Sequence, residues 1–144
     1  MLFGSDRTAL RRTFAQAWAR RVQGLPLESA QVRIADVVAM HPEYHSLLAD
    51  AQSLQRDFGP DESGGNPFLH MALHLSVREQ HASDRPPGVA ALLDALLRRS
   101  GDRHAADHEA MQCLAQVLWE AQRAGTVPAE DHYLECLLLH VRRR

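Results

Sequence analysis

Histidines spaced four residues apart are the residues of this sequence best suited to chemistry. The chain has nine histidines among 144 residues, and they include the pairs His70/His74 and His104/His108. On an α-helix, residues i and i+4 lie about 40° apart around the axis, so each pair can present two imidazoles on one face. An H-x-x-x-H pair of this kind can ligate a single metal ion, as it does in zinc proteases.

A third pair, His41 and His45, has the same spacing, but Pro42 lies between its members. A proline pushes the residue before it out of helical geometry, so we expect a helix to end or kink at His41. Such a break would let His45 turn inward independently. His41 also continues an apolar stripe, because it lies seven residues after Ile34.

The two regular pairs lie at similar depths in their predicted helices. One pair lies four and eight residues after the predicted cap Asn66, and the other lies two and six residues after the predicted cap Asp102. If neighbouring helices alternate in direction, as short connections favour, these two helices run the same way. The helix that ends at His41 then runs the opposite way, and its carboxyl end comes to the same end of the bundle.

We therefore predict a metal site built from histidines. The best ligands are His70, His74 and His108, and His45, His41 or His104 would complete the set. Imidazole suits zinc and iron. Gln112 and Gln116 stand where the carboxylates of a di-iron bundle would have helped, so a histidine-rich zinc or iron site is favoured over a carboxylate-rich one.

The alternative is a structural network of buried histidines in a non-catalytic interaction or regulatory protein. A buried imidazole without a partner costs about 1–3 kcal/mol, and hydrogen bonds could supply the partners as well as a metal could. The isolated histidines His81, His132 and His140 are interpreted as ordinary structural or exposed residues.

Other functions are poorly supported. The sequence contains no P-loop, no dinucleotide-binding glycine motif, no nucleophile elbow and no C-x-x-C-H motif for covalent haem. The sequence therefore identifies no catalytic residue and does not show whether the protein is an enzyme. A formal net charge of -2 argues against a nucleic-acid binder. We expect no membrane partner, and no residue pattern supports a protein partner or a homo-oligomer.

The cytoplasm is the expected location, because no signal peptide is recognisable at the amino end. Cys113 and Cys136 have no metal-binding spacing such as C-x-x-C. In the cytoplasm both should be free thiols. Each lies in a leucine-rich helical pattern, so both are predicted to be reduced, buried and unreactive.

Helical periodicity runs through the whole chain, and strand-like alternation is absent. We predict an all-α fold, a single domain of residues 1–144 that forms a bundle of about five to six helices. Residues 51–65 are predicted to be one long loop, because Gly59-Pro60 and Gly64-Gly65 interrupt them. Six longer helices are expected over residues 5–24, 28–40, 66–81, 86–99, 102–124 and 126–141, and an additional short helix over residues 42–50.

Four stretches resemble successive blocks of a family of small bacterial proteins, the Domain of Unknown Function 1841 family. They read "HPEYHSLL", "NPFLHMALHLSVREQ", "RPPGVAALL" and "HEAMQCLAQVLWEAQRAG". They occur in the order of the family, and the resemblance extends over nearly the whole chain. The resemblance implies a small, single-domain bacterial protein of the cytosol and implies no activity. It also includes Glu79 and Gln80 in a family block.

Overall fold

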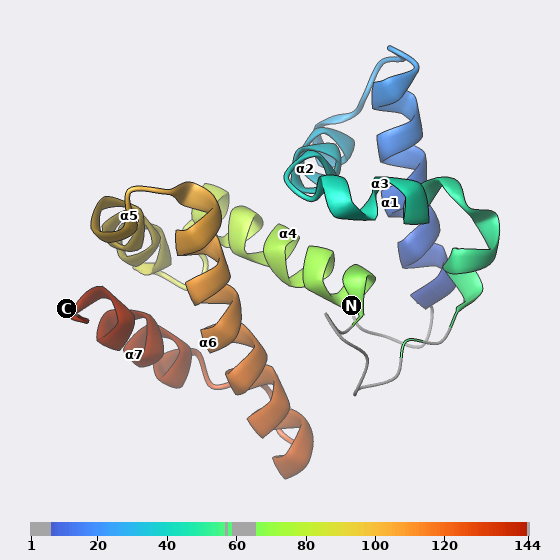
Figure 1. Cartoon of the computed structure of the whole chain (residues 1–144). Coiled ribbons are helices and arrows are strands. Elements are labelled where there is room, and N and C mark those ends of the chain that lie inside the picture. Colours follow the sequence, from blue (N-terminus) through green and yellow to red (C-terminus); the bar gives the residue numbers. More distant parts are fainter. Residues whose placement is uncertain (1–6, 57, 59–65, 144) are drawn as a thin grey trace. The chain divides into compact units, whose positions relative to one another are not determined.

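The computed structural model describes residues 7–56, 58 and 66–143. These residues form seven α-helices and two short 3-10 helices (Figure 1), and no strand occurs among them. The predicted all-α fold is confirmed. The elements are α1 (Arg7–Val22), α2 (Ser29–Ala39), η1 (Pro42–Tyr44), α3 (His45–Ala49), η2 (Ala51–Gln55), α4 (Pro67–Ser83), α5 (Val89–Ser100), α6 (Arg103–Ala124) and α7 (Glu130–Val141).

The predicted helix break at His41 is confirmed. Helix α2 ends at Ala39, and His41 has φ -128° and ψ 66°, which is outside helical geometry. The 3-10 helix η1 then begins at Pro42, and α3 follows at His45. Because the chain turns here, His41 and His45 belong to different elements and face different neighbours.

The prediction of a loop over residues 51–65 is wrong for its first third. Residues 51–55 form the 3-10 helix η2, whose first turn is capped by the Asp50 side chain accepting a hydrogen bond from the backbone N–H of Gln52. Ser53 adds hydrogen bonds from its hydroxyl to the carbonyls of Leu47 and Asp50. Residues 57 and 59–65 of the predicted loop lie outside the described part of the chain.

Side-chain caps set the starts of the two helices that carry the regular histidine pairs. The Asn66 side chain accepts hydrogen bonds from the backbone N–H groups of Phe68 and Leu69, at 3.0 and 3.3 Å. The Asp102 carboxylate accepts one from Ala105 at 3.1 Å. Both residues satisfy amides that have no partner inside the helix, which is why α4 and α6 start where the sequence predicts.

The chain divides into two compact units, Met1–Leu75 and Ser76–Arg144, and the boundary between them falls inside α4. In unit 1, α1 packs on α2 and α3. The amino-terminal half of α4 supplies the remaining apolar side chains of the core. The core residues are Phe14, Ala17, Ile34, Ala35, Val37, Val38, Leu48, Phe68, Met71, Ala72 and Leu75.

An arginine, Arg11, is buried in unit 1 with 2% of its surface exposed. Its Nη1 donates hydrogen bonds to the carbonyls of Leu54 and Arg56, at 3.2 and 2.7 Å. Its guanidinium carbon lies 4.8 Å from the ring centre of Phe68 and 5.4 Å from that of Phe58. Arg11 therefore ties α1 to the segment after η2 and to the start of α4.

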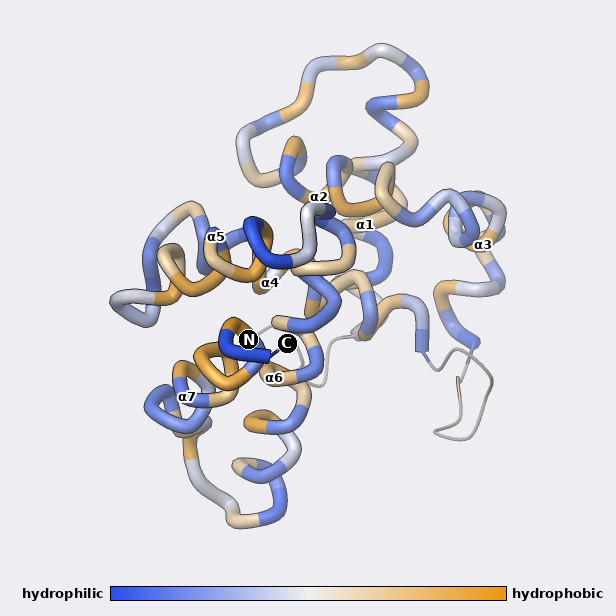
Figure 2. The backbone as a smooth tube through the Cα atoms, turned by 60° about the vertical axis from the view of Figure 1, so that its left-hand side comes forward, coloured by the Kyte–Doolittle hydropathy of each residue, from blue (hydrophilic) through white to orange (hydrophobic). Residues whose placement is uncertain are grey.

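In unit 2, α5, α6 and α7 pack on one another. Apolar and polar residues alternate along these helices (Figure 2), as amphipathic helices require. The buried apolar residues of this unit include Val89, Leu93, Leu96, Ala110, Leu114, Val117 and Leu137.

Two polar contacts tie the carboxyl-terminal half of α4 to α6 and α7. Arg78 forms an ion pair with the buried Asp107 at 2.8 Å, and the Tyr133 hydroxyl donates to the side-chain oxygen of Gln80 at 2.5 Å. Burial, and secondarily the negative charge of Asp107, holds the pKa of Tyr133 well above its ordinary value. The phenol therefore stays protonated and keeps its donor role.

No helix of the described residues is both long and apolar enough to cross a membrane. The longest, α6, carries charged and amide side chains along much of its length.

Candidate metal centre

Three of the six predicted ligands come together in unit 1. The His41 ring centre lies 4.9 Å from that of His70 and 5.1 Å from that of His74, and both pairs are edge-on. A ring nitrogen of His41 and one of His74 lie within 4.8 Å of each other. His41 and His74 have no exposed surface, and His70 is half-buried.

Different elements place these three side chains. His70 and His74 lie one turn apart on α4, behind the Asn66 cap. His41 lies in the non-helical joint between α2 and η1. Tyr44, at the end of η1, stacks on the His41 ring with a centre-to-centre distance of 5.5 Å. Burial, followed by the nearby charge of Glu43, raises the pKa of Tyr44, so its hydroxyl stays neutral.

A backbone carbonyl sets the protonation of His41. Its Nδ1 lies 2.8 Å from the Val37 carbonyl oxygen. A carbonyl can only accept, so Nδ1 carries the hydrogen and Nε2 carries the lone pair. Metal-ligating histidines usually have this arrangement, in which the second nitrogen donates to a carbonyl or carboxylate and fixes the ring.

His45 has a different environment from the other three. Its Nε2 donates to the Val38 carbonyl at 2.8 Å, and its ring lies 4.3 Å from that of Trp18. Together, His41 and His45 bond the carbonyls of Val37 and Val38, two adjacent groups in the last turn of α2. His45 thus holds the end of α2 in place beside His41.

The remaining two predicted ligands form a pair in unit 2. His104 and His108 lie one turn apart near the start of α6, with ring centres 4.1 Å apart. A ring nitrogen of each lies within 4.8 Å of one in the other. Both side chains are half-buried, so the spacing of four residues does place two imidazoles side by side.

Two ring-centre distances in unit 1 match those of imidazoles around one ion, whereas the group of ring nitrogens within 4.8 Å of one another includes His41 and His74 but not His70. With metal–nitrogen bonds of about 2.0–2.1 Å and tetrahedral geometry, the ring centres of two ligating imidazoles lie about 5 Å apart. The pairs of His41 with His70 and with His74 measure 4.9 and 5.1 Å. The donor set is all nitrogen, which suits zinc or iron.

The prediction that Cys113 and Cys136 are free thiols is wrong, because the structure joins them in a disulfide. They face each other from α6 and α7, with Cα atoms 5.7 Å apart, a separation typical of disulfides. Burial was predicted correctly for Cys113, which is 1% exposed, whereas Cys136 is only partly buried. The sequence could not show that their two helices pack at this point.

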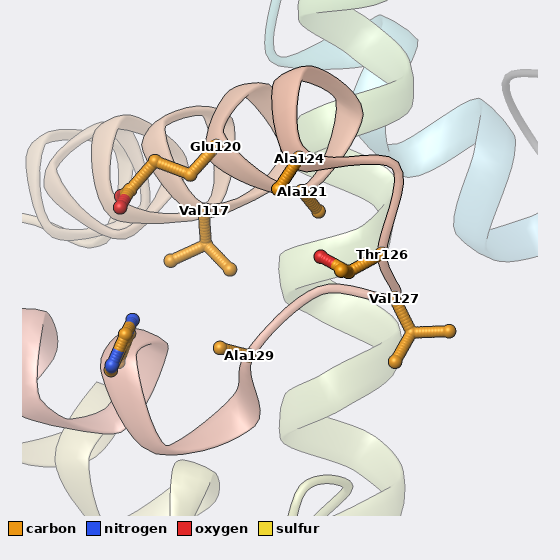
Figure 3. Close-up of a pocket in the computed structure, with 8 residues that line it drawn as sticks. Val117, Glu120, Ala121, Ala124, Thr126, Val127 and Ala129 are labelled. Carbon is orange, nitrogen blue, oxygen red and sulfur yellow. The ribbon is translucent and has the colours of Figure 1, made fainter.

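The isolated histidines have separate partners in unit 2. His81 pairs with Asp94 at 2.7 Å, and His140 Nδ1 lies 3.3 Å from the Glu109 carboxylate. His132 lines a surface pocket between the end of α6 and the start of α7. That pocket is formed mostly by small apolar side chains, among them Ala121, Ala124 and Ala129 (Figure 3). It therefore contains few groups that could bind a metal or catalyse a reaction.

Three residues that contact these histidines were not among the predicted site residues. Tyr44 stacks on His41, Val37 orients it through a backbone carbonyl, and Glu109 bonds His140. The motif "HPEYH" contains Tyr44 three residues after His41, and this spacing is the only sequence signal for any of the three.

Comparison with known protein families matches residues 6–139 to a family described as a domain of unknown function, DUF1841. No curated protein and no solved structure matches the chain. The matched region includes all six predicted ligands and both cysteines, and it covers far more than half of the sequence. The chain belongs to the DUF1841 family.

Proposed function

We propose that this protein binds a transition-metal ion, zinc or iron, through its histidines. His41, His70 and His74 form the first ligand group, and His104 and His108 form a second. The observation that carries the proposal is the environment of His41. Its Nδ1 is bonded to the Val37 carbonyl, and the ring centres of His70 and His74 lie 4.9 and 5.1 Å from its own, distances that imidazoles around one ion can have.

Burial supports a metal over an accidental cluster. Three imidazoles packed together could not all be charged at low cost, because like charges repel strongly where water is excluded. Each neutral imidazole carries one lone pair, and a single bound cation can accept all of them. His45 contributes by holding the end of α2 beside His41 through the Val38 carbonyl.

Three protein ligands leave a coordination position for water or a small ligand. At such a position a metal acts as a Lewis acid and lowers the pKa of bound water. Tyr44 lies beside these histidines, because its ring stacks on that of His41 and lies 6.1 Å from that of His70, which is the most exposed of the three histidines.

A second candidate function is a non-catalytic interaction or regulatory protein whose histidines stabilise the fold. His45 favours it, because its hydrogen bond to Val38 and its contact with Trp18 account for that side chain without any ion. A structural network of this kind predicts a folded protein that takes up no metal.

We also propose that the protein acts in the cytoplasm, on neither nucleic acid nor membranes. Its near-balanced charge of -2 supports this proposal.

Metal titration of matched alanine variants tests the ligand assignment. We expect His70→Ala to lower the affinity for Zn²⁺ about 10-fold or more, because one ligand of the first group is lost. His70 is half-buried, so the variant should fold. The affinity is measured by competition with a chromogenic chelator, in protein purified without a histidine tag.

The matched control is His81→Ala, which removes an imidazole of α4 whose partner is Asp94. It should bind Zn²⁺ like the unaltered chain. Equal affinity of both variants and the unaltered protein would contradict the proposal.

A further inference from the structure

Another group of possible metal ligands lies in unit 2, around the disulfide. The Sγ atoms of Cys113 and Cys136 and a ring nitrogen of His140 all lie within 4.8 Å of one another. Cys136 and His140 are one turn apart on α7, so they share a face, and Cys113 meets them from α6. Two sulfurs and one imidazole are the ligand types of a Cys₂His zinc site.

The carboxylate of Glu109 orients His140 for such a role. Glu109 Oε1 lies 3.3 Å from His140 Nδ1 and 2.6 Å from Arg99 Nη2. The ion pair with Arg99 holds the carboxylate in place, and a carboxylate oxygen can only accept, so Nδ1 carries the hydrogen. His140 Nε2 then carries the lone pair, which is the arrangement of a carboxylate–histidine–zinc triad.

The group can be reached from solvent on one side. Cys136 and His140 line a surface pocket of about 260 Å³, together with His132, Glu135, Leu139 and Arg143. Cys113 is 1% exposed, and the His140 side chain is 11% exposed. An ion or a reductant would therefore approach Cys136 first, while Cys113 stays covered.

We propose that Cys113, Cys136 and His140 form a redox-gated zinc site. In the disulfide form the sulfurs are bonded to each other and hold no metal. A dithiol reductant donates two electrons and two protons, becomes a disulfide itself, and leaves two thiols on the chain. Binding of Zn²⁺ releases the two thiol protons and joins the ion to both thiolates and to His140 Nε2. Water takes the fourth position, on the pocket side.

Geometry and cellular chemistry both support this gating. Ligands of a tetrahedral zinc ion with bonds of about 2.0–2.3 Å lie about 3.3–3.8 Å apart, a spacing that small side-chain movements reach here. A cytoplasmic disulfide is usually transient and redox-active rather than structural, because the compartment keeps thiols reduced. This site shares no residue with the histidine groups of the proposed function and does not depend on them.

Cobalt tests the proposal, because Co²⁺ bound to thiolate gives a near-ultraviolet charge-transfer band that histidine sites lack. The full chain is reduced with a phosphine, freed of the reductant and titrated with Co²⁺ under argon. The band should appear, saturate at one thiolate-bound Co²⁺ per chain and disappear when Zn²⁺ is added. The oxidised chain should show no band. No band in the reduced chain, or the same band in the oxidised chain, would overturn the proposal.

Variants identify the ligands. Cys136→Ser should abolish most of the band, and His140→Ala should lower the Co²⁺ affinity about 10-fold or more. His132→Ala is the matched control, because His132 lies on α7 and lines the same pocket but is not among the three ligands. It should bind like the unaltered chain. If His140→Ala binds as tightly as His132→Ala, His140 is not a ligand and the proposed site is wrong.

Circular dichroism on each variant verifies the fold. If Cys136→Ser does not fold, the more conservative His140→Gln takes its place, with the same expected loss of affinity. Failure of the histidine groups to bind metal would leave the thiolate band unchanged, so the two proposals fail independently.

Discussion

His74→Ala is expected to lower the free energy of unfolding of the metal-loaded protein by about 2–4 kcal/mol, because a ligand is lost and metal-binding free energy is also folding free energy. His74 has no exposed surface and lies 5.1 Å from His41, ring centre to ring centre. Urea unfolding of both proteins, with and without excess chelator, measures the effect. The chelator should erase most of the difference between mutant and unaltered protein.

The chelator dependence separates a ligand from a structural histidine. If His74 only stabilises a hydrogen-bonded core, its removal should destabilise the protein by a similar amount with and without chelator. Equal destabilisation in protein first shown to carry metal would remove His74 from the ligand set. His81→Ala serves as the control and should change the stability by less than about 1 kcal/mol, because its pair with Asp94 is half-exposed.

Arg11→Ala is expected to destabilise unit 1 by about 3 kcal/mol or more, independently of metal. Each hydrogen bond from a charged donor contributes about 1.5–3 kcal/mol, and Arg11 makes two, to the carbonyls of Leu54 and Arg56. The change also leaves a cavity beside Phe68. Urea unfolding followed by circular dichroism, in the presence of chelator, measures the loss.

The neighbouring arginine provides the control for Arg11. Arg12 lies on the same helix and is exposed, so Arg12→Ala should change the stability by less than about 0.5 kcal/mol. A similar small effect for Arg11→Ala would show that the buried guanidinium adds no net stability.

The local part of the fold was predictable because short-range chemistry decides it. Asn66 and Asp102 start α4 and α6 through hydrogen bonds to amides two or three residues away. Pro42 ends the helical geometry at the residue next to it. Caps and prolines act on residues one to three positions away, so the sequence predicts the helix boundaries closely.

Contacts between distant segments were not predictable, because no local pattern encodes them. Arg11 falls on the buried face of α1, three residues before Phe14, but its acceptors lie more than forty residues away. The disulfide likewise needed the packing of α6 on α7, which brings Cys113 and Cys136 within 5.7 Å between Cα atoms.

The candidate site shows the same difference between local spacing and long-range contacts. Spacing alone places His70 beside His74 and His104 beside His108, because each pair lies within one helical turn. That His41 lies against the first of these pairs depends on how α2 and α4 meet in the core of unit 1. Periodicity could show that His41 is buried, but not which residues it contacts.

Metal analysis of the purified protein is the most direct test of the central claim, that the histidines bind a transition metal. The full chain is expressed without a histidine tag, purified without added metal and analysed by inductively coupled plasma mass spectrometry. We expect a reproducible content of at least one zinc or iron ion per chain. A fully folded protein that carries no metal, and takes up no zinc, iron or copper when these are supplied, would contradict the claim.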